Sequence, residues 1–171
     1  TEDLSLSFGG RTLFQNVNAK FTPGNCYGLI GANGAGKSTF LKILSGAQEP
    51  SSGHVSVASG LRISTLKQDH FAFDDVQALQ AVVMGHVRLH ALMTEKDALY
   101  AKPDFSDEDG LRAAELEAEF SDLGGWDAEA NAGQLLNALG IPTDRQTRLV
   151  RELSNSEKVR VLLAQALFGN P

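Results

Sequence analysis

Hydrophobic and polar residues alternate over the first 21 positions of the chain. Leu4, Leu6 and Phe8 are separated by polar residues, and the same two-residue period returns over residues 17–21. A period of two places every second side chain on one face of a strand. Gly9-Gly10, between the two alternating stretches, is typical of a turn. The pattern therefore predicts a hairpin of half-buried strands.

Apolar runs after this hairpin predict a strand that leads directly into a helix. Cys26–Ile30 is an apolar run of strand length. Residues 40–44 predict a helix that ends at Gly46. Two further short strands are predicted over residues 55–57 and 61–66.

The pattern changes to a helical period after residue 68. Ser106 precedes three acidic residues, which is typical of a helix N-cap followed by a first turn that favours negative charge. Pro103 ends the preceding helix, and Asp127 is a candidate cap for a later one. The predicted helices cover residues 76–100, 106–122, 127–140 and a last segment that begins after Ser154.

Length and composition favour an ordinary globular protein. The chain has 171 residues, 42% of them hydrophobic and 21% charged, which suits one domain or one domain with a sub-domain. The apolar runs are far shorter than the ~20 residues needed to cross a bilayer, and no signal peptide is expected at the polar start. The single cysteine, Cys26, excludes an internal disulfide, and we expect it to be a small buried residue.

The net charge of −6 is unevenly distributed along the chain. Residues 95–129 contain 12 acidic and 3 basic residues, whereas the rest contains 9 acidic and 12 basic ones. A strongly acidic segment is repelled by bare nucleic acid. We expect it to form the solvated outer face of helices.

The most informative motif lies between the predicted strand and helix. Gly31-Ala32-Asn33-Gly34-Ala35-Gly36-Lys37-Ser38 fits the phosphate-binding loop G-x-x-x-x-G-K-[ST], the Walker A motif. Glycines allow successive backbone N–H groups to face a polyphosphate, and the following helix adds its positive dipole end. Lys37 is expected to bridge the β- and γ-phosphates, and Ser38 to place its hydroxyl on Mg²⁺. The residues predicted to bind nucleotide are Gly31, Asn33, Gly34, Ala35, Gly36, Lys37, Ser38 and Thr39.

Several motifs, taken together and in this order, resemble an ATP-binding cassette. Besides the phosphate loop they are Leu66-Lys67-Gln68-Asp69 and the run from Leu153 to Leu167. Residues 28–34, Met84-Gly85-His86 and residues 160–168 are similar to the first cassette of bacterial F-subfamily (ABC-F) proteins. That resemblance covers essentially the whole chain. It implies a soluble tandem-cassette ATPase that acts on the ribosome as a translation factor.

The resemblance also assigns roles to residues outside the loop. Phe8 falls where the family places an aromatic ring that stacks on adenine, although a core position in the alternating strand is an equal alternative. Gln68 matches a glutamine that reaches Mg²⁺ and the attacking water. Ser154 and Glu157 match the ends of the signature motif, whose helix start meets the γ-phosphate held by the opposing cassette. The alternative for Ser154-x-x-Glu157 is a purely structural capping box.

Two departures from the family pattern weaken these assignments. Asn155-Ser156 replaces two glycines of the signature, which leaves the phosphate contact in doubt. The sequence ends at Pro171, before the position of the Walker B strand, so no catalytic residue is assigned, and this chain alone is expected to hydrolyse ATP poorly or not at all. Arg145, Arg148 and Arg151 form a basic run before the signature, expected to lie in a solvated loop rather than on RNA.

The expected fold is an α/β P-loop NTPase: a cassette core with an antiparallel β subdomain and an inserted helical subdomain. The expected domains are a nucleotide-binding core over residues 1–75, a helical subdomain over 76–150 and the signature helix over 151–171. The expected function is the ATP-binding domain of a cytoplasmic ABC-F ATPase. Its expected ligands are ATP and Mg²⁺, with Ser38 and Gln68 on the metal, and its expected partners are a second cassette and the ribosome with its rRNA and tRNA, with no membrane. The alternatives are the ATP-binding subunit of a membrane transporter and a nucleotide-dependent interaction module without turnover.

Overall fold

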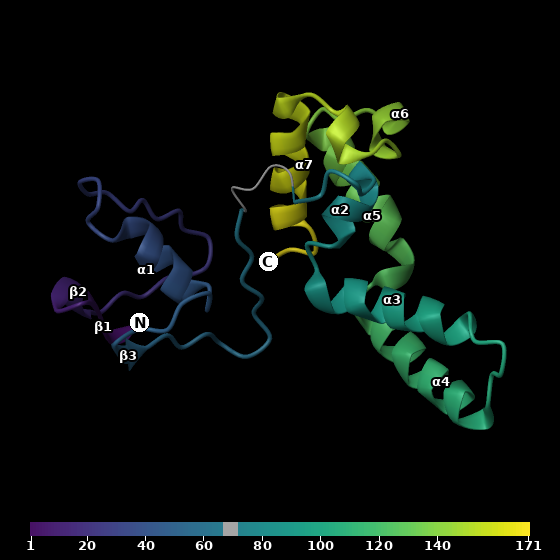
Figure 1. The fold of residues 1–171 in the computed structure, drawn as a ribbon, viewed down its shortest axis with the longest axis horizontal. Coiled ribbons are helices and arrows are strands. Elements are labelled where there is room, and N and C mark those ends of the chain that lie inside the picture. The colour runs from purple at the N-terminus through teal and green to yellow at the C-terminus, as the bar shows by residue number, and fades with distance from the viewer. Residues whose placement is uncertain (67–71) are drawn as a thin grey trace. The chain divides into compact units, whose positions relative to one another are not determined.

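The computed structural model describes residues 1–66 and 72–171 in two compact units, Thr1–Ile63 and Ser64–Pro171 (Figure 1). Each unit has its own hydrophobic core. In these described ranges, no helix is both long and apolar enough to cross a membrane.

The first unit contains a three-stranded antiparallel sheet. Strands β1 (Glu2–Phe8), β2 (Arg11–Val17) and β3 (Ser52–His54) lie in the order β2-β1-β3. Strand β1 pairs with β2 from Phe8 opposite Arg11 to Leu4 opposite Val17, with register irregularities between. The turn at Gly9-Gly10 and the first strand are confirmed, whereas the second strand covers Arg11–Val17 rather than the predicted residues 17–21.

Helix α1 (Lys37–Leu44) packs on this sheet through its apolar side. Phe40 and Ile43 form the buried cluster with Leu4 and Leu6, and the Phe40 ring meets Phe14 of β2 edge-on at a centroid distance of 5.8 Å. Edge-to-face pairs of this kind add to the gain from burial. The sheet therefore fixes the helix that follows the glycine-rich loop, and the predicted helix is confirmed.

The predicted strands over 26–30, 55–57 and 61–66 are wrong for this structure. None of these segments forms a strand, and the third strand covers Ser52–His54 instead. Cys26, expected to be buried, is exposed. An apolar run becomes a strand only when a neighbour pairs with its backbone, and among the described residues no strand pairs with these runs.

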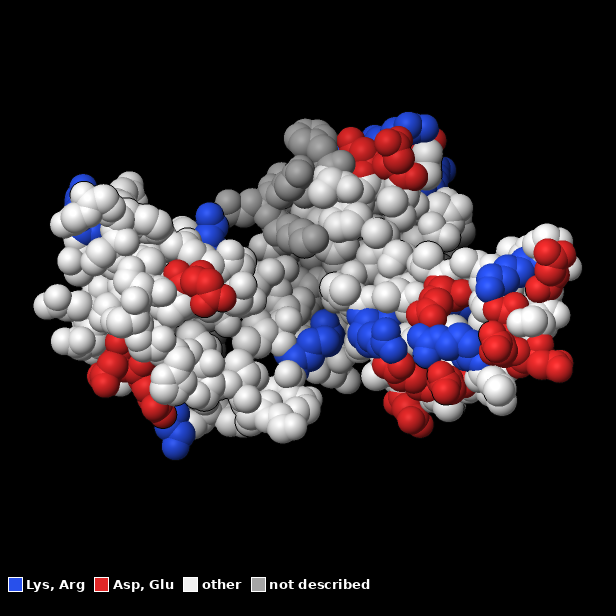
Figure 2. Space-filling model, turned by 60° about the horizontal axis from the view of Figure 1, so that its bottom comes forward, with Lys and Arg blue, Asp and Glu red and all other residues white. Residues whose placement is uncertain are grey.

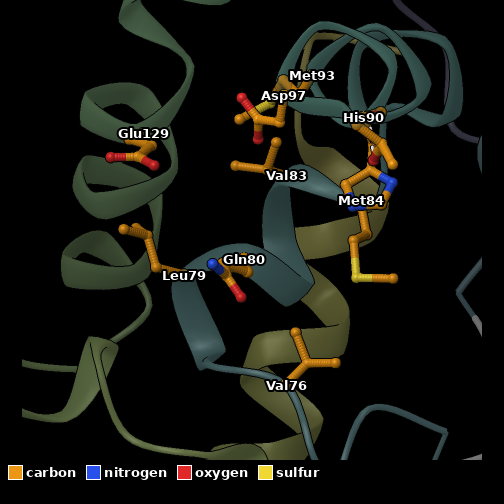
Figure 3. A pocket seen from close by; sticks show the side chains of 10 residues that line it. Val76, Leu79, Gln80, Val83, Met84, His90, Met93, Asp97 and Glu129 are labelled. Carbon is orange, nitrogen blue, oxygen red and sulfur yellow. Dashed lines mark hydrogen bonds between the residues drawn. The ribbon is translucent and has the colours of Figure 1, made fainter. Parts of the chain in front are cut away.

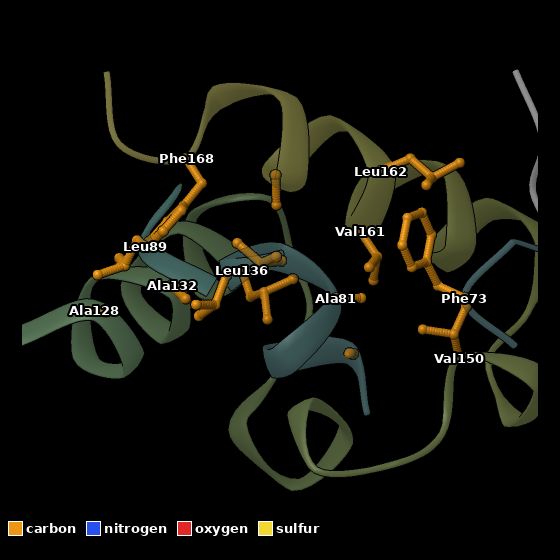
Figure 4. Packing of buried hydrophobic residues seen from close by; sticks show 14 of the residues in the cluster. Phe73, Ala81, Leu89, Ala128, Ala132, Leu136, Val150, Val161, Leu162 and Phe168 are labelled. Carbon is orange, nitrogen blue, oxygen red and sulfur yellow. The ribbon is translucent and has the colours of Figure 1, made fainter. Parts of the chain in front are cut away.

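The second unit is helical. Its helices are α2 (Ala78–Val83), α3 (Val87–Tyr100), α4 (Asp107–Asp122), α5 (Ala128–Ala138), α6 (Thr143–Gln146) and α7 (Asn155–Leu167), with short 3₁₀ turns η1 (Gly125–Asp127) and η2 (Val150–Glu152). Its core brings α2, α5 and α7 together, as Figure 4 shows for Ala81, Leu136 and Val161, all fully buried.

One helix predicted over 76–100 is in fact two. Helix α2 ends before Met84-Gly85, and His86 begins α3 by accepting a hydrogen bond from Leu89 N–H through Nδ1 at 3.2 Å. A Cβ on Gly85 would lie only 2.1 Å from the carbonyl oxygen of Gln165 in α7. The close approach of α7 therefore requires glycine at the break, a constraint from a residue 80 positions later in the chain.

Two helix starts carry capping boxes; the sequence predicted the box at Ser154, and at Ser106 it predicted the N-cap. The hydroxyl of Ser106 accepts from Asp109 N–H, and Asp109 accepts from Ser106 N–H, at 3.2 and 3.1 Å. Ser154 and Glu157 do the same at the start of α7. The predicted cap at Asp127 is wrong, because that residue closes η1 and makes no side-chain capping bond.

Helices α3 and α4 form an antiparallel hairpin that extends from the rest of the second unit (Figure 1). Arg88 pairs with Glu119 across it, and Arg112 lies 2.7 Å from Glu95. Figure 2 shows acidic and basic groups adjacent to one another over this hairpin. Within the acidic segment, Lys102 and Arg112 pair with acids, whereas Lys96 lies over the rings of Phe120 and Trp126.

Candidate functional site: the glycine-rich loop and the start of the signature helix

Two glycines shape the loop that precedes α1. Gly34 has φ 80° and Gly36 has φ 94°, both in the left-handed region that residues with a Cβ avoid. A Cβ on Gly36 would also lie 3.2 Å from the Phe14 ring, whereas the space around Gly34 is open. The loop is closed by a bond from Ala35 N–H to the Ala32 carbonyl at 3.2 Å. These constraints explain glycine at both motif positions.

The Lys37 ammonium folds back over the loop. Its Nζ donates to the carbonyl of Gly31 at 2.7 Å and to that of Ala32 at 2.8 Å. Lys37 is also the first residue of α1, so the helix and the loop fix its backbone together. A lysine that reaches across a glycine-rich loop places a positive charge where an anion would enter.

The first turn of α1 supplies backbone donors. Phe40 N–H makes the first helical bond, to the Gly36 carbonyl at 2.8 Å. The N–H groups of Lys37, Ser38 and Thr39 have no acceptor within the described part of the chain, and no acidic side chain lies in this turn. Free N–H groups at a helix start, with a positive dipole end, fit phosphate oxygens.

The fit for a metal ion is less complete than the fit for phosphate. The Ser38 hydroxyl, at the helix start, can serve as one oxygen ligand. Gln68, the second expected ligand, lies outside the described residues. Over the described ranges no group of three acidic, histidine or cysteine side chains is placed to hold a metal ion.

Phe8 lies at the end of β1, with 53% of its surface exposed. That exposure rules out a core position, one of the two alternatives for this ring. An exposed aromatic face can stack on a flat ring. Contact with adenine stays a prediction for Phe8.

At the second predicted site, Ser154 and Glu157 bind each other at the start of α7. The Ser154 hydroxyl donates to Glu157 Oε2 at 2.7 Å, and Ser154 N–H donates to the same atom at 2.9 Å. Arg145 Nη1 donates to the other oxygen at 2.5 Å. The Ser154 hydroxyl and N–H bonds lower the pKa of the Glu157 carboxyl, with Arg145 adding to the effect. The structure thus shows the capping box, which by itself requires no nucleotide.

Ser156, one of the two residues that replace the signature glycines, lies beside another arginine. Arg160 Nη2 donates to the Ser156 hydroxyl at 3.2 Å, and its Nη1 donates to the Gly140 carbonyl at 3.4 Å. Arg145 and Arg160 therefore surround the start of α7 with positive charge. The sequence did not reveal these contacts, because Arg145 was expected to lie in a solvated loop.

Comparison with known proteins identifies the family. The family model described as ABC transporter matches residues 14–171. The uncharacterized ABC transporter ATP-binding protein YkpA of Bacillus subtilis (strain 168) is 61% identical over 99% of this chain and 31% of its own length. ABC transporter F family member 4 of Arabidopsis thaliana is 34% identical over 99% of this chain and 24% of its own. The energy-dependent translational throttle protein EttA of Mycobacterium tuberculosis (strain CDC 1551 / Oshkosh) is 29% identical over 95% of this chain and 29% of its own length.

A solved structure supports the fold. A putative metal-chelate type ABC transporter in an inward-facing conformation superposes with a TM-score of 0.59 and 21% identity, over 97% of this chain and 54% of that one. The chain spans about a third of the length of YkpA. The α/β P-loop cassette fold with an antiparallel sheet and a helical part is confirmed. The chain belongs to the ATP-binding-cassette family.

Proposed function

We propose that this chain binds ATP with Mg²⁺ through the loop at residues 31–39. The observation that carries the proposal combines three features: left-handed Gly34 and Gly36, the Lys37 ammonium over the loop, and the first three N–H groups of α1, which have no acceptor among the described residues. All three favour a polyphosphate. Phe8 would stack on the adenine, and Ser38 and Gln68 would face the metal.

The chain's own residues would act in a simple order. Triphosphate entry exchanges the contacts of Lys37 with the Gly31 and Ala32 carbonyls for charge-assisted bonds to phosphate, which are the stronger kind. The donors of α1 then hold the phosphates in place. Mg²⁺ would neutralise charge on the β- and γ-phosphates.

We further propose that the whole protein is a cytoplasmic ATPase that acts on the ribosome in translation. Support comes from the F-subfamily relatives and from EttA, which is named as a translational throttle protein. In this proposal a second cassette completes the nucleotide site, and Ser154 at the start of α7 meets the phosphate bound by that cassette. The proposed partners on the ribosome are ribosomal RNA and tRNA.

Calorimetric titration with Mg-ATP tests the nucleotide site. The wild-type chain should release heat that Lys37→Ala abolishes. Lys42→Ala is the matched control, because Lys42 is an exposed lysine in the last turn of the same helix. Loss of binding in both variants, or in neither, would contradict the role given to Lys37.

Co-sedimentation with purified ribosomes tests the second part. The protein should pellet with ribosomes more strongly with Mg-ATP than without nucleotide. Co-purification with a membrane subunit, and no ribosome binding under either condition, would favour the transporter alternative instead.

A further inference from the structure

A cavity of about 290 Å³ opens in the helical unit, far in sequence from the phosphate loop. Helices α2, α3 and α5 line it (Figure 3). Its volume is at the lower end of the range for small-molecule sites. None of its lining residues belongs to the proposed nucleotide site.

The wall of the cavity is apolar and adaptable. Val76, Leu79 and Val83 supply aliphatic surface, and Met84 and Met93 supply thioethers. Unbranched thioether side chains adjust to ligands of irregular shape. The wall therefore suits a hydrocarbon body rather than a sugar or a phosphate.

Two of the five polar residues that line the cavity are acidic. Asp97 of α3 and Glu129 of α5 bring carboxylates to it from two helices (Figure 3). Neither carboxylate has a hydrogen bond or an ion pair within residues 1–66 and 72–171. Glu129 lies in the first turn of α5. Gln80, His90 and Thr94 complete the polar lining.

We propose that this cavity binds a small organic ammonium ion with an aliphatic or aromatic body. An ammonium group can donate hydrogen bonds to Asp97 or Glu129, while its hydrocarbon part covers Val83 and Met93. Anions are repelled by the two carboxylates, and a neutral molecule cannot form charge-assisted hydrogen bonds from an ammonium group to them. The proposal does not depend on nucleotide binding.

Amide NMR shifts of the ¹⁵N-labelled chain test the site, with 2-phenylethylammonium as the probe. Shifts are expected at residues that line the cavity, with saturation in the millimolar range. The neutral isostere 2-phenylethanol should bind at least about tenfold more weakly, which is about 1.4 kcal/mol or more. Equal binding of the two probes, or no shift at all, would overturn the proposal.

Charge-removing variants connect the binding to the carboxylates. Glu129→Gln and Asp97→Asn should each lower the affinity for the ammonium probe several-fold and leave the affinity for 2-phenylethanol unchanged. Both side chains are exposed, so the variants should fold, which unchanged amide spectra elsewhere would verify. Glu108→Gln, an exposed acid of α4 that does not line the cavity, is the matched control. If the control loses as much affinity as the two variants, the overall charge of the chain explains the effect, and the proposed site is refuted.

Discussion

The Lys158 ammonium lies 2.6 Å from the Asp74 carboxylate, and only 7% of the Lys158 side chain is exposed. This ion pair ties α7, four residues after the signature serine, to the segment that follows residue 71. The backbone supports the same connection, because Arg151 N–H donates to the Asp74 carbonyl at 3.1 Å and Val150 N–H to the Val76 carbonyl at 2.9 Å. Arg151 also pairs with Asp75 at 2.6 Å. The start of α7 is thus held by a segment some 80 residues earlier in the chain.

Lys158→Met should destabilise the helical unit. The change leaves Asp74, 30% exposed, without the ammonium that it faces. Loss of one partner of a mostly buried pair costs about 1–3 kcal/mol, so the free energy of unfolding measured in urea should fall by about that amount.

Asp74→Asn with Lys158→Met should recover part of the loss, because no uncompensated charge remains. Lys102→Met is a matched control, since Lys102 also pairs at 2.6 Å but its side chain is 51% exposed. That change should cost less than about 1 kcal/mol. Equal losses for Lys102→Met and Lys158→Met would show that burial of the Lys158 pair is unimportant.

Acid should weaken both capped helix starts over a narrow pH range. The Lys102 ammonium and the bonds from Ser106 lower the pKa of Asp109 to about 2, and the bonds from Ser154 lower the pKa of Glu157. A carboxyl with a lowered folded pKa stabilises the protein above its unfolded value of about 4. That contribution is lost as the pH falls from about 4 towards about 2.

Titration of the side-chain carboxyl carbons by NMR measures these values directly. The Asp109 signal should titrate near pH 2, well below the ordinary pKa of an aspartate. Ser106→Ala removes the hydroxyl bond and should shift the Asp109 titration upward, while the Glu157 titration stays in place. An Asp109 titration at its ordinary pKa in the wild type would refute the assigned cause.

Two glycine substitutions should change stability in opposite directions. Gly85→Ala places a Cβ 2.1 Å from the Gln165 carbonyl oxygen, so α2 and α7 must move apart. Overpacking of this kind costs about 1–3 kcal/mol or more. Gly110→Ala, inside α4, meets only the Phe105 ring at 3.7 Å and should stabilise the helix by about 0.5–1 kcal/mol. Thermal unfolding measures the stability of each variant relative to the wild type. Stabilisation by both substitutions would contradict the close packing at Gly85.

The features that the sequence predicted correctly are local ones. A capping box needs only Ser106 and Asp109, or Ser154 and Glu157, and all four lie within single turns. The first hairpin is also local, because a glycine turn joins strands that are neighbours in the chain. The glycine-rich loop and the helix start after it were predictable for the same reason, since the glycines, Lys37 and the first residues of α1 are consecutive.

The incorrect predictions involve partners that are distant in sequence. The run at 26–30 has the composition of a strand, but a strand also requires a neighbour for its backbone, and composition carries no information about one. The break at Gly85 depends on Gln165, and the role of Arg145 depends on Glu157. The hydrophobic pattern around each position does not predict these contacts.

Gly34→Ala and Gly36→Ala should separate backbone strain from steric contact in the phosphate loop. Both glycines have positive φ, so each alanine costs about 1–2 kcal/mol in backbone strain. At Gly36 the new Cβ also meets the Phe14 ring at 3.2 Å, whereas at Gly34 it meets nothing within 4 Å. Gly36→Ala should therefore lower the free energy of unfolding of the first unit more than Gly34→Ala does. In the Mg-ATP titration both should weaken binding, because relaxation of either residue turns loop N–H groups away from the phosphates. Unchanged affinity in both variants would mean that the left-handed loop geometry does not serve nucleotide binding, even if Lys37 does.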